Sequence, residues 1–167
     1  APLVDPLIDR DGEIVGGSHW GGGVARRVCP ATMPSAKSLL DLARMKEKGV
    51  DGIYYLDAMP SPLFPCFSPA HPAGRREYAE GLRRLTAAAR RTFGAVTTEG
   101  YLDYIAEDLD MAWHVPPPVR EMVRFDAKLS YIDELVPFYQ VAFHGLLLYH
   151  AGYEYGYAGS GLGADAA

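Results

Sequence analysis

Two carboxylic acids each follow a short apolar segment. Asp57 follows residues 53–56 (IYYL), and Glu99 follows residues 95–98 (AVTT), little more than one strand–helix repeat later. If these segments are neighbouring parallel strands, their carboxyl ends lie at one edge of the sheet and the acids face each other. Hydrolysis of a glycosidic bond needs such a pair, because one group attacks or stabilises the anomeric carbon and the other protonates the leaving oxygen. A separation of about 5–5.5 Å predicts retention of configuration, and about 6.5–9.5 Å predicts inversion.

Either acid could instead be a helix N-cap or an ordinary loop residue. No helix is predicted to begin within two residues of Asp57 or Glu99, which favours the chemical interpretation. A non-catalytic alternative stays open, in which a carbohydrate-binding remnant of a barrel uses the two carboxylates only to hydrogen-bond sugar hydroxyls.

Other side chains are candidates for contacts with a sugar. His71 and Arg75 lie in or beside the proline-rich loop after the first acid, and such loops line substrate clefts. Asp110 and Trp113 follow the second strand and suit a hydrogen-bond partner and a stacking platform. His144 lies at the end of a third apolar run. An exposed loop position for His71 and a core position for His144 are the alternatives.

Metal chemistry is a less favoured alternative. A metal-dependent hydrolase could bind its ion at His71, Asp110 or His114. Within AEDLDMAWH (106–114), however, the spacing of Glu107, Asp108, Asp110 and His114 matches neither an EF-hand nor a zinc signature. The sequence therefore predicts no cofactor.

Cys29 and Cys66 could pair if the fold brings them together, although two buried thiols are favoured. The chain contains no G-x-S-x-G elbow and no glycine-rich phosphate loop.

Helices and strands are predicted to alternate after residue 34. Ser35 is a good N-cap, and apolar residues recur at helical spacing in both predicted helices. The predicted helices are 35–48 and 75–93, and the predicted strands are 52–57, 95–98 and part of 136–150, ending near His144. Residues 1–34 are predicted to be irregular, with one strand candidate at 13–15, and the glycine- and alanine-rich tail 156–167 is predicted to be flexible.

This alternation predicts an α/β fold with a parallel sheet. A (β/α)8 barrel of the TIM type fits better than a doubly wound sheet, because the chemical residues follow strand ends and no phosphate loop is present. A whole barrel needs roughly 250 residues, whereas the chain has 167. We therefore expect a partial barrel, with a catalytic module at 35–155 between the irregular segment 1–34 and the tail.

Charge and hydropathy exclude several classes of partner. The net charge is −5 and the pI is near 5.5, with paired arginines interleaved with acids, so no nucleic-acid partner is predicted. No uninterrupted apolar segment reaches the length of a membrane span, so no membrane partner is predicted. The first residues, APLVDPL, suggest a processed end or an excised piece, and the cellular compartment is not indicated.

The motifs DGIYYLDAM, CFSPAHPAGRREYAEGLRRL and AVTTEG occur in an order and spacing that resembles the catalytic half of barrel glycoside hydrolases. The resemblance is greatest to the endo-α-N-acetylgalactosaminidase-like families and related uncharacterised bacterial domains. The later VPFYQVAFHG is similar to a strand further round such barrels, so the resemblance covers roughly residues 45–150.

This resemblance implies a retaining hydrolase of oligosaccharides or glycoconjugates, with Asp57 as nucleophile and Glu99 as general acid/base. It also implies that His144 lies near the sugar. The sequence departs from the family pattern because TTEG lacks a tryptophan beside the glutamate and the amino-terminal strands of a barrel are missing. The rest of the barrel would come from segments outside this chain.

Overall fold

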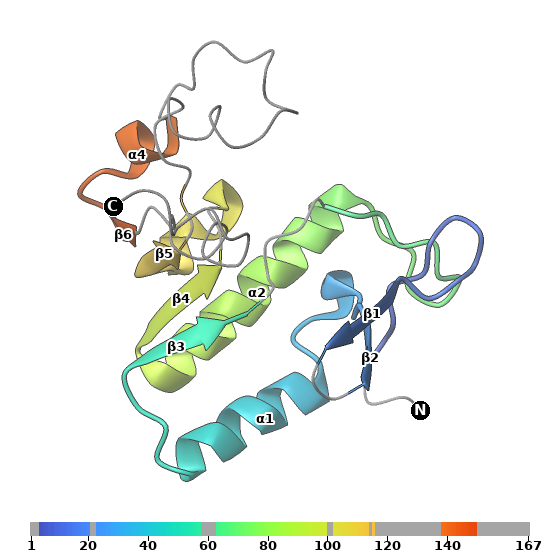
Figure 1. Ribbon diagram of the computed structural model, residues 1–167, viewed down its shortest axis with the longest axis horizontal. Helices are drawn as coiled ribbons and strands as arrows, with labels where there is room; N and C mark the ends of the chain where they lie inside the picture. Colours follow the sequence, from blue (N-terminus) through green and yellow to red (C-terminus); the bar gives the residue numbers. More distant parts are fainter. Residues whose placement is uncertain are drawn as a thin grey trace, which may run out of the picture.

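The protein is described by a computed structural model, shown in Figure 1. A two-stranded antiparallel sheet and a four-stranded parallel sheet flank two long helices. The structure describes residues 4–20, 23–57, 63–99, 102–113, 115 and 138–149.

The parallel sheet is built from strands in simple sequence order. Its order is β3-β4-β5-β6, and every neighbouring pair is parallel. The strands are β3 (Ile53–Leu56), β4 (Ala95–Glu99), β5 (Met111–Trp113) and β6 (Leu148–Tyr149). The predicted α/β class with a parallel sheet is therefore confirmed, as are the strands predicted at 52–57 and 95–98.

Helix α2 (Arg75–Phe93) covers one face of this sheet, and its predicted bounds are confirmed. The ring of Phe93 stacks on Tyr54 of β3, with centroids 4.2 Å apart and planes 8° from parallel. Val96 of β4 is fully buried in the same core. Because side chains alternate along a strand, the even-numbered residues of β3 and β4 face α2.

The odd-numbered side chains therefore point to the opposite face. On β3 the exposed side chains of this face are Ile53 (51%) and Tyr55 (44%). Leu148 of β6 is in register with Met111 and, through it, with Thr97, so it lies on the same face, and it is 67% exposed. Large apolar side chains at such exposure are typical of a face that another layer normally covers.

Helix α1 (Ala36–Glu47) lies beside α2 (Figure 1) and confirms the helix predicted at 35–48. The side chain of Ser35 accepts a hydrogen bond from the backbone N–H of Ser38 at 3.1 Å, as expected of an N-cap. Gly49 ends the helix in the left-handed region, with φ of 85°.

The amino-terminal residues are attached to α2 by a close backbone contact. The short 3₁₀ helix η1 (Pro30–Thr32) packs against α2 at Gly81, where a Cβ atom would lie 1.6 Å from the carbonyl oxygen of Pro30. Arg84, one turn later, donates to the carbonyls of Ala31 at 2.8 Å and Met33 at 3.0 Å. Glycine at position 81 is therefore a requirement of packing.

The prediction for residues 1–34 was wrong in its strands. A hairpin occupies part of this segment, formed by β1 (Gly16–Trp20) and β2 (Gly23–Arg26), whereas Ile14 makes only an isolated bridge to Ile8. The glycines that suggested irregular chain have a different role. Gly16 adopts φ of 141° at a register shift, and a Cβ there would lie 2.6 Å from the carbonyl oxygen of Ala25.

The strand predicted to end near His144 was also wrong. Residues 138–143 form helix α4 (Phe138–Phe143), and in the described part of the chain only the two residues of β6 follow as strand. Tyr139 and Phe143, one helical turn apart, pack with ring centroids 4.5 Å apart. A continuous apolar run does not distinguish a buried strand from a helix, and this pair of aromatic residues was the signal for a helix.

The 3₁₀ helix η2 (Asp103–Asp108) connects β4 to β5. Its buried Ile105 joins the core beneath α2, while Ala112 and Tyr139 belong to a second, smaller cluster.

None of the helices in the described ranges combines the length and apolar character that crossing a bilayer requires. The predicted tail 156–167 lies outside the described residues.

We expect Gly81→Ala to lower the free energy of unfolding by about 1–3 kcal/mol, because the new methyl group meets backbone and not a movable side chain. Elsewhere in a helix interior the same change gains about 1 kcal/mol. The test is therefore whether Gly81→Ala lowers or raises the free energy of unfolding, measured by urea denaturation. The reverse change Ala79→Gly, on the same helix, should cost only the propensity difference. A Gly81→Ala protein more stable than wild type would contradict the described contact.

Candidate active site

The two predicted catalytic acids lie at the same edge of the parallel sheet. Leu56 of β3 pairs with Thr98 of β4, so the next position along each strand brings Asp57 beside Glu99. Asp57 is exposed, and Glu99 is half-buried. The hydroxyl of Thr98 donates to the carbonyl of Leu56 at 3.1 Å and ties the two strand ends together immediately before the acids.

Trp113 extends this row onto the third strand. It is the last residue of β5 and pairs in register with Glu99. By the alternation of the strands, Trp113 and Glu99 share the face that points away from α2. The carboxyl edge of the sheet therefore presents Asp57, Glu99 and Trp113 in sequence, and we call these three residues the carboxyl-edge row.

Asp110 is not part of this row. It immediately precedes β5 and therefore lies at the amino-terminal edge of the sheet. Its carboxylate accepts a hydrogen bond from the backbone N–H of Val96 at 2.9 Å and pairs with Arg90 of α2 at 3.1 Å. Arg90 also donates to the carbonyl of Glu107 at 3.3 Å. Asp110 thus links α2 to the beginnings of two strands.

His144 lies near Asp110 and not near the acids. It occupies the turn between α4 and β6, and its Nδ1 lies 3.4 Å from the hydroxyl of Tyr149. A hollow of about 410 Å³ is lined by Asp110, His144 and the residues that follow His144, up to Tyr149. This hollow lies at the amino-terminal ends of β5 and β6, so it is separate from the carboxyl-edge row.

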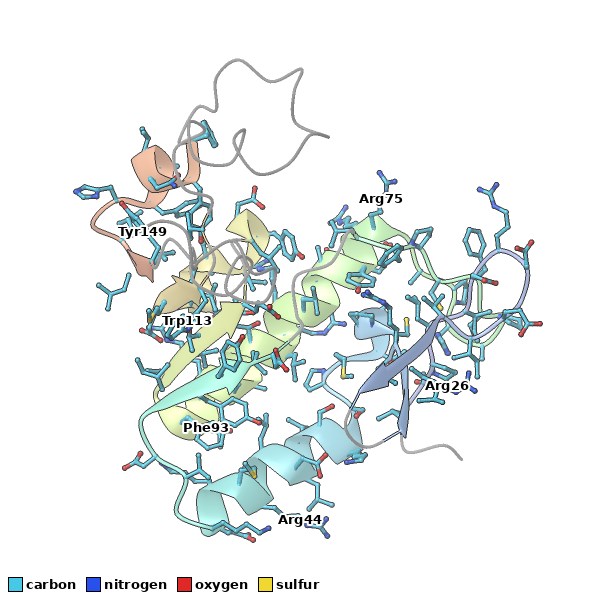
Figure 2. All side chains as sticks on the ribbon, viewed as in Figure 1. Arg26, Arg44, Arg75, Phe93, Trp113 and Tyr149 are labelled. Atoms are coloured by element: carbon cyan, nitrogen blue, oxygen red, sulfur yellow. The ribbon has the colours of Figure 1, made fainter. Side chains whose placement is uncertain are left out.

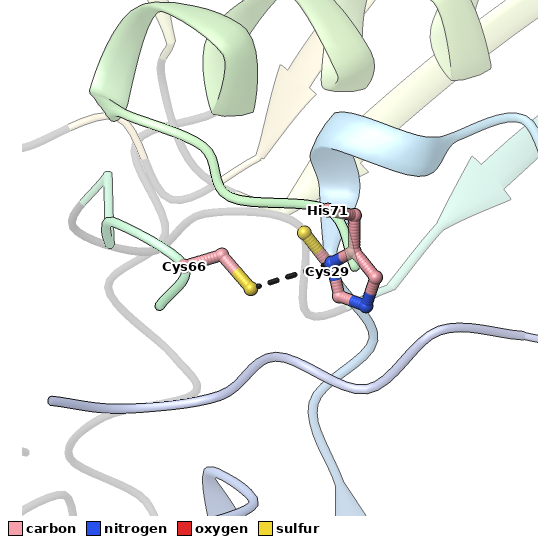
Figure 3. A group of neighbouring side chains, drawn as sticks. All are labelled: Cys29, Cys66 and His71. Carbon is pink, nitrogen blue, oxygen red and sulfur yellow. Dashed lines mark hydrogen bonds between the residues drawn. The ribbon is translucent and has the colours of Figure 1, made fainter. Parts of the chain in front are cut away.

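His71 is brought together with the two cysteines (Figure 3). Its Nδ1 lies 3.5 Å from the sulfur of Cys66, and the ligand atoms of Cys29, Cys66 and His71 all lie within 4.8 Å of one another. Both cysteines are free and buried, as predicted. Burial, followed by the neighbouring Cys66, raises the pKa of the Cys29 thiol to about 11.

Sequence reasoning did not predict this cluster. Its local signal was the pair formed by Cys66 and His71, five residues apart in a proline-rich loop. Cys29 is distant in sequence, and only the packing of the amino-terminal segment against this loop reveals it.

Arg75 is the exposed first residue of α2, at the opposite end of the helix from Phe93 (Figure 2). The three residues considered for a hydrolytic metal are not assembled within the described part of the chain. His71 lies with the cysteines, Asp110 is paired with Arg90, and His114 falls outside the described residues.

Comparison with known proteins finds similarity at the level of structure. Neither a protein-family model nor a curated protein sequence matches the chain. The fold is similar to α-N-acetylgalactosaminidase NagBb from Bifidobacterium bifidum, with a TM-score of 0.67, 18% identity and coverage of 86% of this chain. The GalNAc complex of that protein gives a TM-score of 0.66 at 18% identity and 86% coverage. Its Gal-NHAc-DNJ complex gives 0.68 at 18% identity and 84% coverage.

The chain spans 22–23% of the length of these structures. At such identity the likeness shows the fold alone. The resemblance to glycoside hydrolases related to the endo-α-N-acetylgalactosaminidase-like families is confirmed at that level, whereas the barrel stays a prediction.

Because both carboxylate oxygens of Asp110 have partners, we expect Asp110→Ala to destabilise the fold. Loss of the acceptor for the Val96 N–H should cost about 1–3 kcal/mol in the free energy of unfolding, and loss of the partly exposed pair with Arg90 at most about 1 kcal/mol more. Chemical denaturation measures the combined change in the free energy of unfolding. The nearby Asp108→Ala is the matched control and should stay within about 0.5 kcal/mol of wild type. Unchanged stability combined with lost sugar binding would point instead to a substrate contact.

Proposed function

We propose that the chain is the strand-and-helix portion of a retaining glycoside hydrolase in which Asp57 is the nucleophile and Glu99 the general acid/base. The observation that carries this proposal is the register of β3 against β4, which aligns the two acids at one sheet edge. Chemistry in barrel enzymes occurs at the carboxyl ends of parallel strands.

Strand spacing supports retention over inversion. Neighbouring strands lie about 4.7–4.9 Å apart, and in-register residues project to the same face. That spacing is close to the roughly 5–5.5 Å between carboxyl groups of retaining enzymes and well short of the roughly 6.5–9.5 Å of inverting ones. A water molecule between the two acids, which inversion requires, would need a wider gap.

In the proposed reaction, a carboxylate oxygen of Asp57 attacks the anomeric carbon as the glycosidic C–O bond breaks. Glu99 gives its proton to the departing oxygen, which leaves as an alcohol. In the second step Glu99, now a carboxylate, takes a proton from water as the water oxygen attacks the anomeric carbon. The bond to Asp57 breaks, and both acids return to their starting states.

The carboxyl-edge row also supports a binding role for Trp113. A tryptophan next to the acid/base offers an apolar plane against which the C–H face of a sugar ring can lie. We further propose that the exposed side chains on this face of the sheet are covered by the remaining strands of a (β/α)8 barrel. The sequential parallel strand order and the partial coverage of the matched structures support that completion.

The neighbouring structures support a proposal for the substrate class. The matched protein is named an α-N-acetylgalactosaminidase, and one of its structures is a GalNAc complex. We therefore propose an α-linked N-acetylgalactosaminide as substrate. A second candidate function is sugar binding without hydrolysis, in which the exposed Asp57 and the half-buried Glu99 only accept hydrogen bonds from sugar hydroxyls.

We expect Asp57→Ala to abolish hydrolysis of an aryl α-N-acetylgalactosaminide by the whole protein, because no glycosyl–enzyme bond can form. Glu99→Ala should lower turnover of substrates with poor leaving groups by about 10²–10⁴-fold. Added azide separates the two roles. It should restore turnover of the Glu99→Ala protein on the aryl glycoside and give a glycosyl azide of retained configuration. With Asp57→Ala, any azide product should have inverted configuration.

Asp108→Ala is the matched carboxylate control and should retain wild-type turnover. Near-normal activity of either the Asp57→Ala or the Glu99→Ala protein would refute the assignment. Sugar binding by wild type with no turnover of any aryl glycoside would favour the non-catalytic candidate.

A further inference from the structure

The cluster of Cys29, Cys66 and His71 has the composition of a metal site. The three side chains come from two segments distant in sequence (Figure 3). Cys29 directly precedes η1, whereas Cys66 and His71 lie in the loop between β3 and α2. Both sulfurs are almost completely buried, and the imidazole is half-buried.

We propose that these three side chains bind a Zn²⁺ ion, which cross-links the loop after β3 to the amino-terminal segment. The proposal does not depend on the glycosidase assignment. It also differs from the hydrolytic metal considered above, since neither Asp110 nor His114 takes part.

The distances suit tetrahedral coordination. With Zn–S bonds of about 2.3 Å and Zn–N bonds of about 2.0–2.1 Å, a tetrahedron places sulfur and nitrogen about 3.6 Å apart and two sulfurs about 3.8 Å apart. The sulfur of Cys66 lies 3.5 Å from Nδ1 of His71. All three ligand atoms fall within 4.8 Å of one another, so the edges that involve Cys29 exceed those of a zinc tetrahedron by about 1 Å at most.

The donor set selects the metal. Thiolate and imidazole favour Zn²⁺ over Ca²⁺ or Mg²⁺, which prefer oxygen ligands. Two thiolates also neutralise the charge of a divalent ion, so the buried site holds no net charge, which burial would penalise. Three protein ligands leave the fourth position to water, which can approach from the half-exposed side of His71.

A backbone N–H group already points at one of the two sulfurs. The N–H of Ile8 donates to the sulfur of Cys66 at 3.5 Å. Such a donor favours the thiolate over the thiol and orients it, which is how surrounding hydrogen bonds support metal ligands.

A metal ion here would have a structural consequence for the loop. At present the loop is joined to the amino-terminal segment by a backbone hydrogen bond from Phe67 to Ile8 at 2.9 Å, and it is closed by a two-way backbone pair between Cys66 and Ala73. Zinc would add bonds from this loop to the residue before η1. The loop lies between Asp57 and α2 in the chain, so zinc would anchor the segment that leads from the proposed nucleophile to that helix.

The test begins with metal content. Purified in zinc-containing buffer without an affinity tag, the protein should hold one zinc ion per chain by elemental mass spectrometry. Replacement by Co²⁺ should give a thiolate-to-cobalt charge-transfer band and the intense visible bands of tetrahedral cobalt. Removal of zinc by a chelator should lower the melting temperature, and adding zinc should restore it.

Variants then identify the ligands. Cys66→Ser and His71→Ala should each lose most of the bound zinc, whereas Ser68→Ala, a buried residue of the same loop, and His144→Ala, an exposed histidine elsewhere, should keep it. If Cys66→Ser fails to fold, the zinc content of His71→Ala and the cobalt spectrum of the wild-type protein still test whether the site binds a metal. A Cys29–Cys66 disulfide, detected as a mass two hydrogens below the dithiol with no bound metal, would overturn the proposal. So would a His71→Ala protein with full zinc content.

Discussion

The parallel pairing of β3 with β4 is the constraint on which the candidate active site depends. The acids belong to different strands and are separated by a whole helix, so only the register brings them together. A shift of one residue would turn one acid to the opposite face of the sheet. The stacking of Tyr54 on Phe93 prevents such a shift, because it fixes which side chains of β3 face α2.

Helix α2 therefore connects the parts of the molecule. At its carboxyl end it positions β3 and, through Arg90 and Asp110, the beginnings of β4 and β5. In its middle, Gly81 allows η1 to approach closely, and η1 directly follows Cys29. The carboxyl-edge row and the cysteine–histidine cluster are thus held by one helix, although they serve separate proposed purposes.

The helices and strands that depend on local sequence patterns could be predicted from the sequence. Both long helices follow from their capping residues and apolar spacing, and the strands before Asp57 and Glu99 follow from short apolar runs bounded by glycine. The position of Trp113 beside Glu99 could only be proposed, because it depends on how β5 pairs with β4.

Other features depend on contacts that no local pattern encodes. Asp110 stands close to Trp113 in sequence, yet it lies at the opposite edge of the sheet, because it precedes the three-residue strand β5 and Trp113 ends it. The hairpin β1–β2 was missed because glycine signals irregular chain more often than a bulge. His71 was assigned to the sugar because its loop follows Asp57, whereas its neighbours are sulfurs from two segments that only the folded chain unites.

The position of β3 at the margin of the sheet has a dynamic consequence. Within the described residues β3 borders one strand, β4, whereas β4 is flanked on both sides. Local opening of a sheet starts where hydrogen bonds are fewest, so backbone amides next to Asp57 should exchange with solvent deuterium sooner than those next to Glu99. Asp57, the proposed nucleophile, would then be the more mobile member of the pair. A further strand pairing with β3 would slow this exchange.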